Sequence, residues 1–130
     1  MSAYFFLSFS IHAEEVRVYN WSDYIDQSVI DQFEESTGIK VIYDVFDSNE
    51  VLEGKLLAGS TGYDIVSPSI EYLGRQVRAN IHLELNKSAI PNFDNLDPVM
   101  MELLSTMDPD NRFAIPYLWG TTGIGYNRAA

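Results

Sequence analysis

Two aromatic rings, a hydroxyl and a carboxylate occupy the four consecutive positions Trp21-Ser-Asp-Tyr24. They follow Val16–Asn20, a β-branched and aromatic run typical of a strand. Ligands of open α/β sheets bind beyond the carboxyl ends of strands, which is where this cluster is expected. A carboxylate beside aromatic faces suits an ammonium ion on an apolar stem, with a cation–π contribution of about 0.5–2 kcal/mol. We therefore expect Trp21, Ser22, Asp23 and Tyr24 to contact a ligand.

The same residue types also have structural interpretations. Trp21 and Tyr24 suit a hydrophobic core, and Ser22 with Asp23 suits a capping turn before a helix. A carboxylate-based hydrolase is a further alternative, with Asp23 acting beside Asp64 or Glu71. The sequence shows no pairing signal for these acids, so we predict that the chain is not an enzyme.

The residues that thiol chemistry or a metal site would require are absent or wrongly spaced. The chain has no cysteine and two histidines, His12 and His82, and neither has a second histidine at ligand spacing. The acidic stretch Asp44–Glu50 lacks the spacing and central glycine of a calcium loop. We predict no metal and no cofactor.

The elements that position the Trp21–Tyr24 cluster follow from periodicity and capping signals. We expect helices to alternate with short strands, and this alternation indicates an α/β fold with a mostly parallel sheet flanked by helices on both faces. The expected elements after the first strand are a helix Gln27–Thr37 capped by Asp26 or Ser28 and ended by Gly38, a strand Ile39–Phe46, a helix capped by Ser48 or Asn49 that ends before Gly59, a strand Tyr63–Ser67, a helix from Ser69 to about Ala79, a helix from Asp97 to Met107, a turn Asp108–Asn111, and two strands, Phe113–Trp119 and Thr121–Asn127.

Composition restricts the class of protein. The 130 residues suffice for one domain with a core, and 46% of them are hydrophobic. The net charge of −11 argues against nucleic-acid binding and favours attraction of cations. Residues 1–13 are apolar and resemble a secretory signal without its basic start, so we expect a truncated signal peptide and export. This segment is too short to span a bilayer, and we predict no transmembrane span.

Four further segments, taken with Trp21–Tyr24, carry a resemblance to a known family. They are Phe33–Val41, Asp44–Leu56, Ala114–Tyr117 and Thr121–Asn127. With these motifs in this order, the chain resembles the periplasmic polyamine-binding proteins, which are the receptors of ABC importers for putrescine and spermidine. The resemblance implies a periplasmic-binding-protein type II-like lobe, in a family whose ligand is enclosed between two lobes joined by a hinge.

The resemblance also implies a division of the chain and a set of partners. Family members are longer, so we expect a fragment in which residues 14–120 form the first lobe, 121–130 begin the crossover, and the second lobe is missing. The ligand would be putrescine first and spermidine next, and the partner an ABC permease, with a monomeric parent protein in the periplasm. Matched to the family's motifs, the ligand-binding residues are Trp21, Ser22, Asp23, Tyr24, Ser69 and Glu71.

An alternative function belongs to the interaction class. The chain would then be a stand-alone acidic module that associates with a partner, or with its own copy, through the surface that a second lobe would cover.

Overall fold

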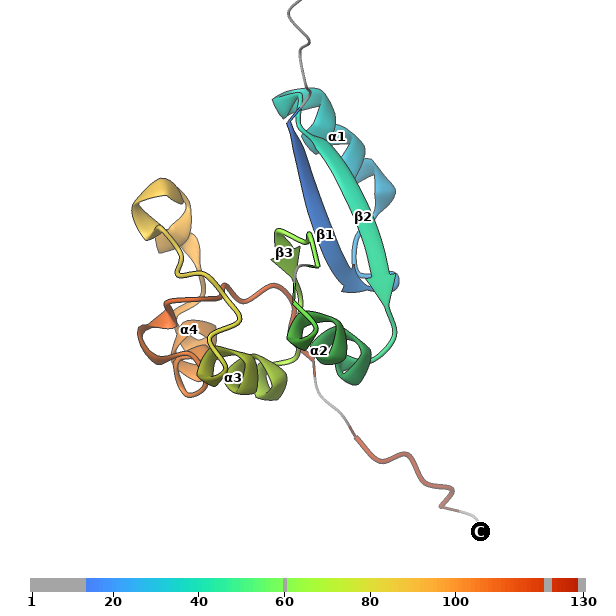
Figure 1. Cartoon of the computed structure of the whole chain (residues 1–130). Helices are drawn as coiled ribbons and strands as arrows, with labels where there is room; N and C mark the ends of the chain where they lie inside the picture. The colour runs from blue at the N-terminus through green and yellow to red at the C-terminus, as the bar shows by residue number, and fades with distance from the viewer. Residues whose placement is uncertain (1–13, 60, 121–122, 129–130) are drawn as a thin grey trace, which may run out of the picture. The chain divides into compact units, whose positions relative to one another are not determined.

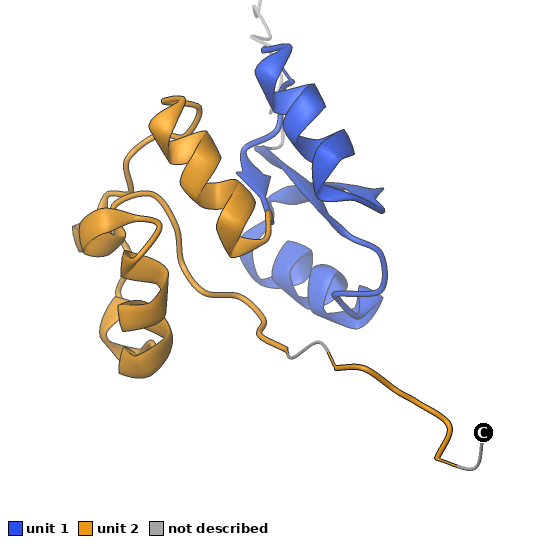
Figure 2. Ribbon diagram, turned by 90° about the horizontal axis from the view of Figure 1, so that it is seen from below, with its two compact units in different colours: residues 1–67 blue, residues 68–130 orange. Residues whose placement is uncertain are grey.

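The computed structural model describes residues 14–59, 61–120 and 123–128. The chain divides into two compact units, Met1–Ser67 and Pro68–Ala130 (Figure 2). The predicted signal, residues 1–13, lies outside the described residues, as do residues 121 and 122 of the predicted crossover. The predicted boundaries 1–13, 14–120 and 121–130 therefore stay predictions.

The first unit contains a three-stranded parallel sheet. Its strands β1 (Glu15–Trp21), β2 (Lys40–Phe46) and β3 (Ile65–Val66) lie in the order β2-β1-β3. β1 and β2 run side by side over their whole length (Figure 1), with a register that begins at Glu15↔Lys40 and ends at Trp21↔Phe46. β3 pairs with the other edge of β1 through only two residues. The parallel sheet predicted from the sequence is confirmed.

Two helices, α1 (Gln27–Thr37) and α2 (Asn49–Leu57), flank this sheet, which lies between them in Figure 2. The Asp26 carboxylate caps α1 by accepting a hydrogen bond from the Ser28 backbone N–H (2.8 Å). Gly38 ends α1 with φ 73°, a left-handed conformation that glycine adopts without steric cost. The Ser48 hydroxyl caps α2. Both helices begin and end as the capping signals predict.

The core of the first unit is aromatic and lies on the sheet face covered by α2. Tyr19, Phe46 and Leu52 are buried there, and Leu52 has no exposed surface. Residues that alternate along a strand share a face, so Trp21 lies on the same side of β1 as Tyr19. Four partly buried side chains pack against this core: Trp21, Leu56, Tyr63 and Val66.

The second unit is built from short helices. Its described residues form two α-helices, α3 (Ile70–Arg78) and α4 (Pro98–Ser105), and three short 3-10 helices, η1 (Lys87–Ala89), η2 (Phe93–Asn95) and η3 (Pro109–Asn111). The Asp97 carboxylate caps α4 by accepting hydrogen bonds from the backbone N–H groups of Val99 (2.8 Å) and Met100 (3.1 Å).

None of the helices in the described segments is long and apolar enough to cross a bilayer.

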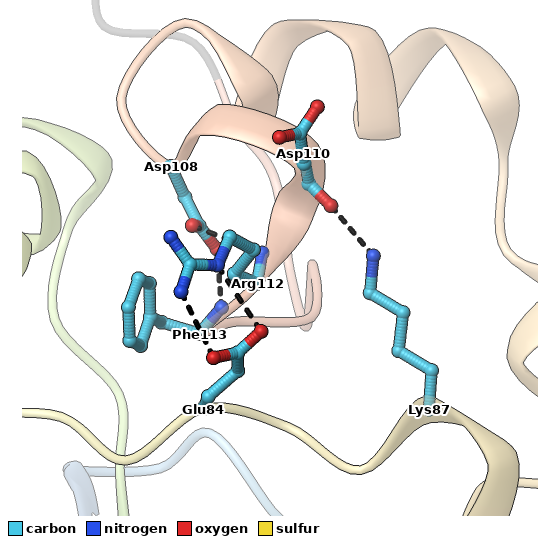
Figure 3. A network of polar contacts seen from close by, with 6 residues as sticks. All are labelled: Glu84, Lys87, Asp108, Asp110, Arg112 and Phe113. Atoms are coloured by element: carbon cyan, nitrogen blue, oxygen red, sulfur yellow. Dashed lines mark hydrogen bonds and ion pairs between the residues drawn. The ribbon is translucent and has the colours of Figure 1, made fainter.

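A buried carboxylate holds the turn after α4 (Figure 3). Asp108 is 0% exposed, and its two oxygens accept three backbone N–H groups, from Arg112 (3.0 Å), Phe113 (2.8 Å) and Ala114 (2.9 Å). Beside this carboxylate, the Arg112 guanidinium makes two hydrogen bonds with Glu84 and lowers the pKa of that exposed carboxyl. The turn predicted at Asp108–Asn111 is confirmed, and Asp108 is the residue that organises it.

The two strands predicted near the end of the chain are wrong. The described residues from Phe113 onward, namely 113–120 and 123–128, contain no strand. Their apolar side chains are largely open to solvent, with Trp119 77% and Ile124 94% exposed. β-propensity expresses how well a side chain fits a paired, half-buried surface, and none of the described strands forms a ladder with these residues.

We expect the stability of the second unit to depend on pH through His82. Its ring Nε2 lies 2.9 Å from the Gln76 side-chain oxygen, and burial lowers the pKa of His82 although the Asp108 carboxylate opposes this shift. The folded protein then holds fewer protons than the unfolded chain, so its free energy of unfolding falls as the pH drops below about 6.5. Urea unfolding at stepped pH should show this slope, and a His82→Gln variant should reduce it. An unchanged slope in the variant would refute the assignment.

Candidate functional site

The end of β1 presents a short turn to solvent. Ser22 and Asp23 follow the strand directly and are both exposed. Asp23 has φ 60°, a left-handed conformation that costs most residues about 1 kcal/mol or more but that aspartate tolerates better than most. This conformation belongs to the turn through which the chain leaves the sheet toward α1.

The indole of Trp21 is held from two sides. Its Nε1–H donates to the Ser67 carbonyl oxygen at 2.9 Å, and its ring packs against Phe46 with 4.6 Å between centroids. Trp21 is nevertheless only partly buried. Because the one donor of the indole is already used, any further contact of Trp21 would involve its ring face rather than a hydrogen bond.

A second ring and a carboxylate complete the cluster. Tyr24 is 46% exposed, and its ring centroid lies 6.2 Å from that of Trp21. Among the residues that the structure describes, the Asp23 carboxylate has no hydrogen-bond or ion-pair partner. The structure thus brings Trp21, Ser22, Asp23 and Tyr24 together at the exposed carboxyl end of a strand. Their role as ligand contacts stays a prediction.

The other two predicted ligand residues belong to the second unit. Ser69 is the N-cap residue of α3, as predicted, but its side chain makes no capping hydrogen bond. Glu71 lies exposed in the first turn of α3, where a negative charge interacts favourably with the helix dipole. Both residues keep their ligand role as an expectation from the resemblance.

Sequence reasoning missed the residues behind this site. Nothing local to Ser67 indicates that its carbonyl accepts a hydrogen bond from Trp21, because the two residues lie 46 positions apart in sequence. No group of three or more metal-ligating side chains occurs within the described ranges. Acidic residues greatly outnumber basic ones in the first unit, which favours approach of a cation.

Comparison with curated proteins gives clear relatives, although no family model matches the chain. The chain is 59% identical over 112 residues to the putrescine-binding periplasmic protein PotF of Escherichia coli K12. These matched residues make up 86% of this chain and 30% of that relative. It is 55% identical to the putrescine-binding periplasmic protein SpuD of Pseudomonas aeruginosa UCBPP-PA14, again over 86% of this chain and 30% of the relative. The spermidine/putrescine-binding periplasmic protein of Salmonella typhimurium is 41% identical over 113 residues, which cover 86% of this chain and 32% of that protein. The chain thus spans about a third of the length of these relatives.

Solved structures agree with the sequence comparison. The spermidine/putrescine substrate-binding protein PotD of Streptococcus pneumoniae matches with a TM-score of 0.76 and 41% identity, over 82% of this chain and 32% of that chain. A putative spermidine/putrescine ABC transporter protein of Listeria monocytogenes matches with a TM-score of 0.78 and 44% identity, over 82% of this chain and 33% of that chain. The predicted fold class, an α/β lobe of a substrate-binding protein, is confirmed.

These relatives are named for binding and not for catalysis, which agrees with the prediction of a protein that is not an enzyme. They do not favour the alternatives of a hydrolase or a stand-alone acidic module. Identities of 41–59% over most of this chain, together with the shared fold, show that the chain is homologous to the periplasmic putrescine- and spermidine-binding proteins over a segment that spans about a third of their length.

Proposed function

We propose that this chain is part of an extracytoplasmic receptor that captures a linear polyamine, putrescine first and spermidine next, for uptake by an ABC transporter. The observation that carries the proposal is the arrangement at the end of β1. There the exposed Asp23 carboxylate, which has no partner among the described residues, follows the held indole of Trp21 and precedes the exposed ring of Tyr24. The relatives, named for binding putrescine or spermidine, support the same ligand class.

Each residue has a distinct role in this proposal. Asp23 accepts hydrogen bonds from one terminal ammonium group and neutralises its charge. The faces of Trp21 and Tyr24 pack against the methylenes and add a cation–π attraction. The hydroxyl oxygens of Ser22 and Ser69 accept N–H donors, and Glu71 attracts an additional ammonium. None of these steps makes or breaks a covalent bond.

The organisation of the whole receptor is part of the proposal. Residues 14–120 would form most of the first lobe and 121–130 would begin the crossover, with the ligand enclosed when two lobes close about a hinge. Residues 1–13 would derive from a secretory signal, and the receptor would act as a periplasmic monomer that delivers its ligand to a permease. The periplasmic names of the relatives support this location.

Calorimetry on a full-length receptor that carries this segment tests the proposal. We expect saturable binding of putrescine or spermidine that weakens with added salt, because the attraction is between charges. The proposal fails if neither amine produces heat and neither competes with the other.

For the 130-residue chain alone we expect only weak binding. Without a second lobe the Asp23 carboxylate stays in water, where an ion pair contributes about 0–1 kcal/mol. Such contacts correspond to a dissociation constant of roughly millimolar or weaker. The measurement is an NMR titration of the chain with putrescine, and micromolar affinity would contradict the expectation.

A further inference from the structure

The position of the Trp21 indole depends on a very short strand. Its hydrogen-bond acceptor, the Ser67 carbonyl, directly follows the two residues of β3. The backbone bonds that flank β3 are Asp64 N to Arg17 O (2.9 Å) and Ser67 N to Tyr19 O (3.2 Å). So short a ladder gives the Ser67 carbonyl little support of its own.

The side chain of Tyr63 adds support at the start of β3, next to the Asp64 carboxylate, which accepts the Arg17 backbone N–H at 2.8 Å. Its ring stacks on that of Tyr19 in β1, with 4.6 Å between centroids and an interplanar angle of 4°. Its hydroxyl donates to Asp44 Oδ2 at 2.7 Å, and Asp44 is the register partner of Tyr19 on β2. Tyr63 therefore ties the chain that enters β3 to both other strands of the sheet.

Lys55 of α2 covers this contact from the helix side. Its ammonium donates to the Tyr63 hydroxyl at 3.2 Å and lies 4.5 Å and 5.0 Å from the ring centroids of Tyr19 and Tyr63. The hydrogen bond to Tyr63 raises the pKa of Lys55, and the hydrogen bond to Asp44 raises the pKa of Tyr63. At neutral pH both donors therefore keep their protons. We call Asp44, Lys55 and Tyr63 the hydroxyl latch.

We propose that Tyr63 is a positioning residue for the polyamine site, although it acts only through other residues. The hydroxyl latch holds β3 so that the Ser67 carbonyl keeps its bond with the Trp21 indole N–H, and this bond keeps the indole face at the end of β1. The part of the proposal that concerns the ligand rests on the proposed function. The part that concerns the indole is independent of any ligand.

Hydrogen exchange of the indole N–H groups tests the latch in the 130-residue chain. Trp21 donates to a carbonyl, whereas Trp119 is 77% exposed and serves as an internal reference. In a Tyr63→Phe variant, which keeps the ring and loses the hydroxyl, we expect the Trp21 indole to exchange about tenfold faster. The Trp119 indole should not change. Tyr126→Phe, the same chemical change at an exposed position, should leave both rates as in the unsubstituted chain.

Two further measurements separate the latch from general destabilisation. The exchange rate of the Trp21 indole is divided by that of the backbone amide of Leu52, which lies in the buried core. A Lys55→Met variant, which keeps the apolar stem and loses the ammonium, should shift this ratio in the same direction by a smaller factor. An unchanged ratio in Tyr63→Phe overturns the proposal.

The effect of Tyr63 on ligand binding is measured in a full-length receptor that carries this segment. There Tyr63→Phe should raise the putrescine dissociation constant by roughly fivefold to tenfold, the loss expected for one hydrogen bond. A variant that frees the indole but binds putrescine as tightly as the unsubstituted protein overturns the positioning role. If the unsubstituted receptor binds no polyamine, the proposed function fails, and the exchange ratio still decides whether the latch holds Trp21.

Discussion

In a full-length receptor that carries this segment, an Asp23→Asn variant is expected to bind putrescine roughly 10-fold to 150-fold more weakly. A hydrogen bond to a charged group contributes about 1.5–3 kcal/mol, and the enclosed ammonium would lose the carboxylate that neutralises it. Asparagine has the same shape and also tolerates the left-handed conformation observed at φ 60°. Folding should therefore be preserved, and calorimetry reports the loss of the charge alone.

The matched control for this variant is Asp47→Asn. Asp47 is another exposed carboxylate of the first unit, and it follows β2 as Asp23 follows β1. The two variants change the net charge equally, so they alter long-range attraction of the cation to a similar extent. If both bind putrescine with the same affinity, Asp23 is not the ammonium partner.

An Asp108→Asn variant is expected to lower the free energy of unfolding of the second unit by roughly 3 kcal/mol or more. The buried carboxylate accepts three backbone N–H groups, and an amide placed there points its own N–H₂ group at one or two of them. A buried donor left without an acceptor costs about 1–3 kcal/mol. Hydrogen exchange at the Phe113 and Ala114 amides, with urea unfolding, measures the effect.

Asp110→Asn is the control for Asp108→Asn. Asp110 lies two residues away in the same turn, is exposed, and contributes a main-chain oxygen rather than its carboxylate to the hydrogen bond from Lys87 (2.6 Å, Figure 3). Its φ of 62° suits asparagine as well as aspartate. We expect a change within about 0.5 kcal/mol. Equal destabilisation by both variants would show that the three backbone hydrogen bonds of Asp108 do not stabilise the turn.

Elements whose signals lie within a few residues could be predicted from the sequence. Asp26 and Gly38 mark the two ends of α1, and Ser48 and Asp97 begin α2 and α4 through bonds to backbone groups two or three residues away. The alternation of such helices with short β-branched runs is enough to indicate a parallel sheet. The exposed place of Asp23 at the end of β1 follows from the same local pattern.

Features that depend on distant partners could not be predicted. The bond from Trp21 to Ser67 requires the pairing of β1 with β3, which no local pattern specifies. The same holds for Tyr63, whose role is fixed by the register of Tyr19 with Asp44. The predictions of strands at Phe113–Trp119 and Thr121–Asn127 failed for the converse reason, since a strand-like sequence forms no strand without a neighbour.

The most direct test of the polyamine site is a map of where putrescine binds on the 130-residue chain. Two-dimensional NMR spectra, recorded as putrescine is added, report every backbone amide and both indole N–H groups. We predict that the largest shifts occur at the Trp21 indole and at the amides of Ser22, Asp23 and Tyr24, and that they disappear in Asp23→Asn and in roughly 1 M salt, where charges are screened within about 3 Å. Shifts that leave Trp21–Tyr24 unchanged, or that persist in Asp23→Asn, would contradict the assignment of this site.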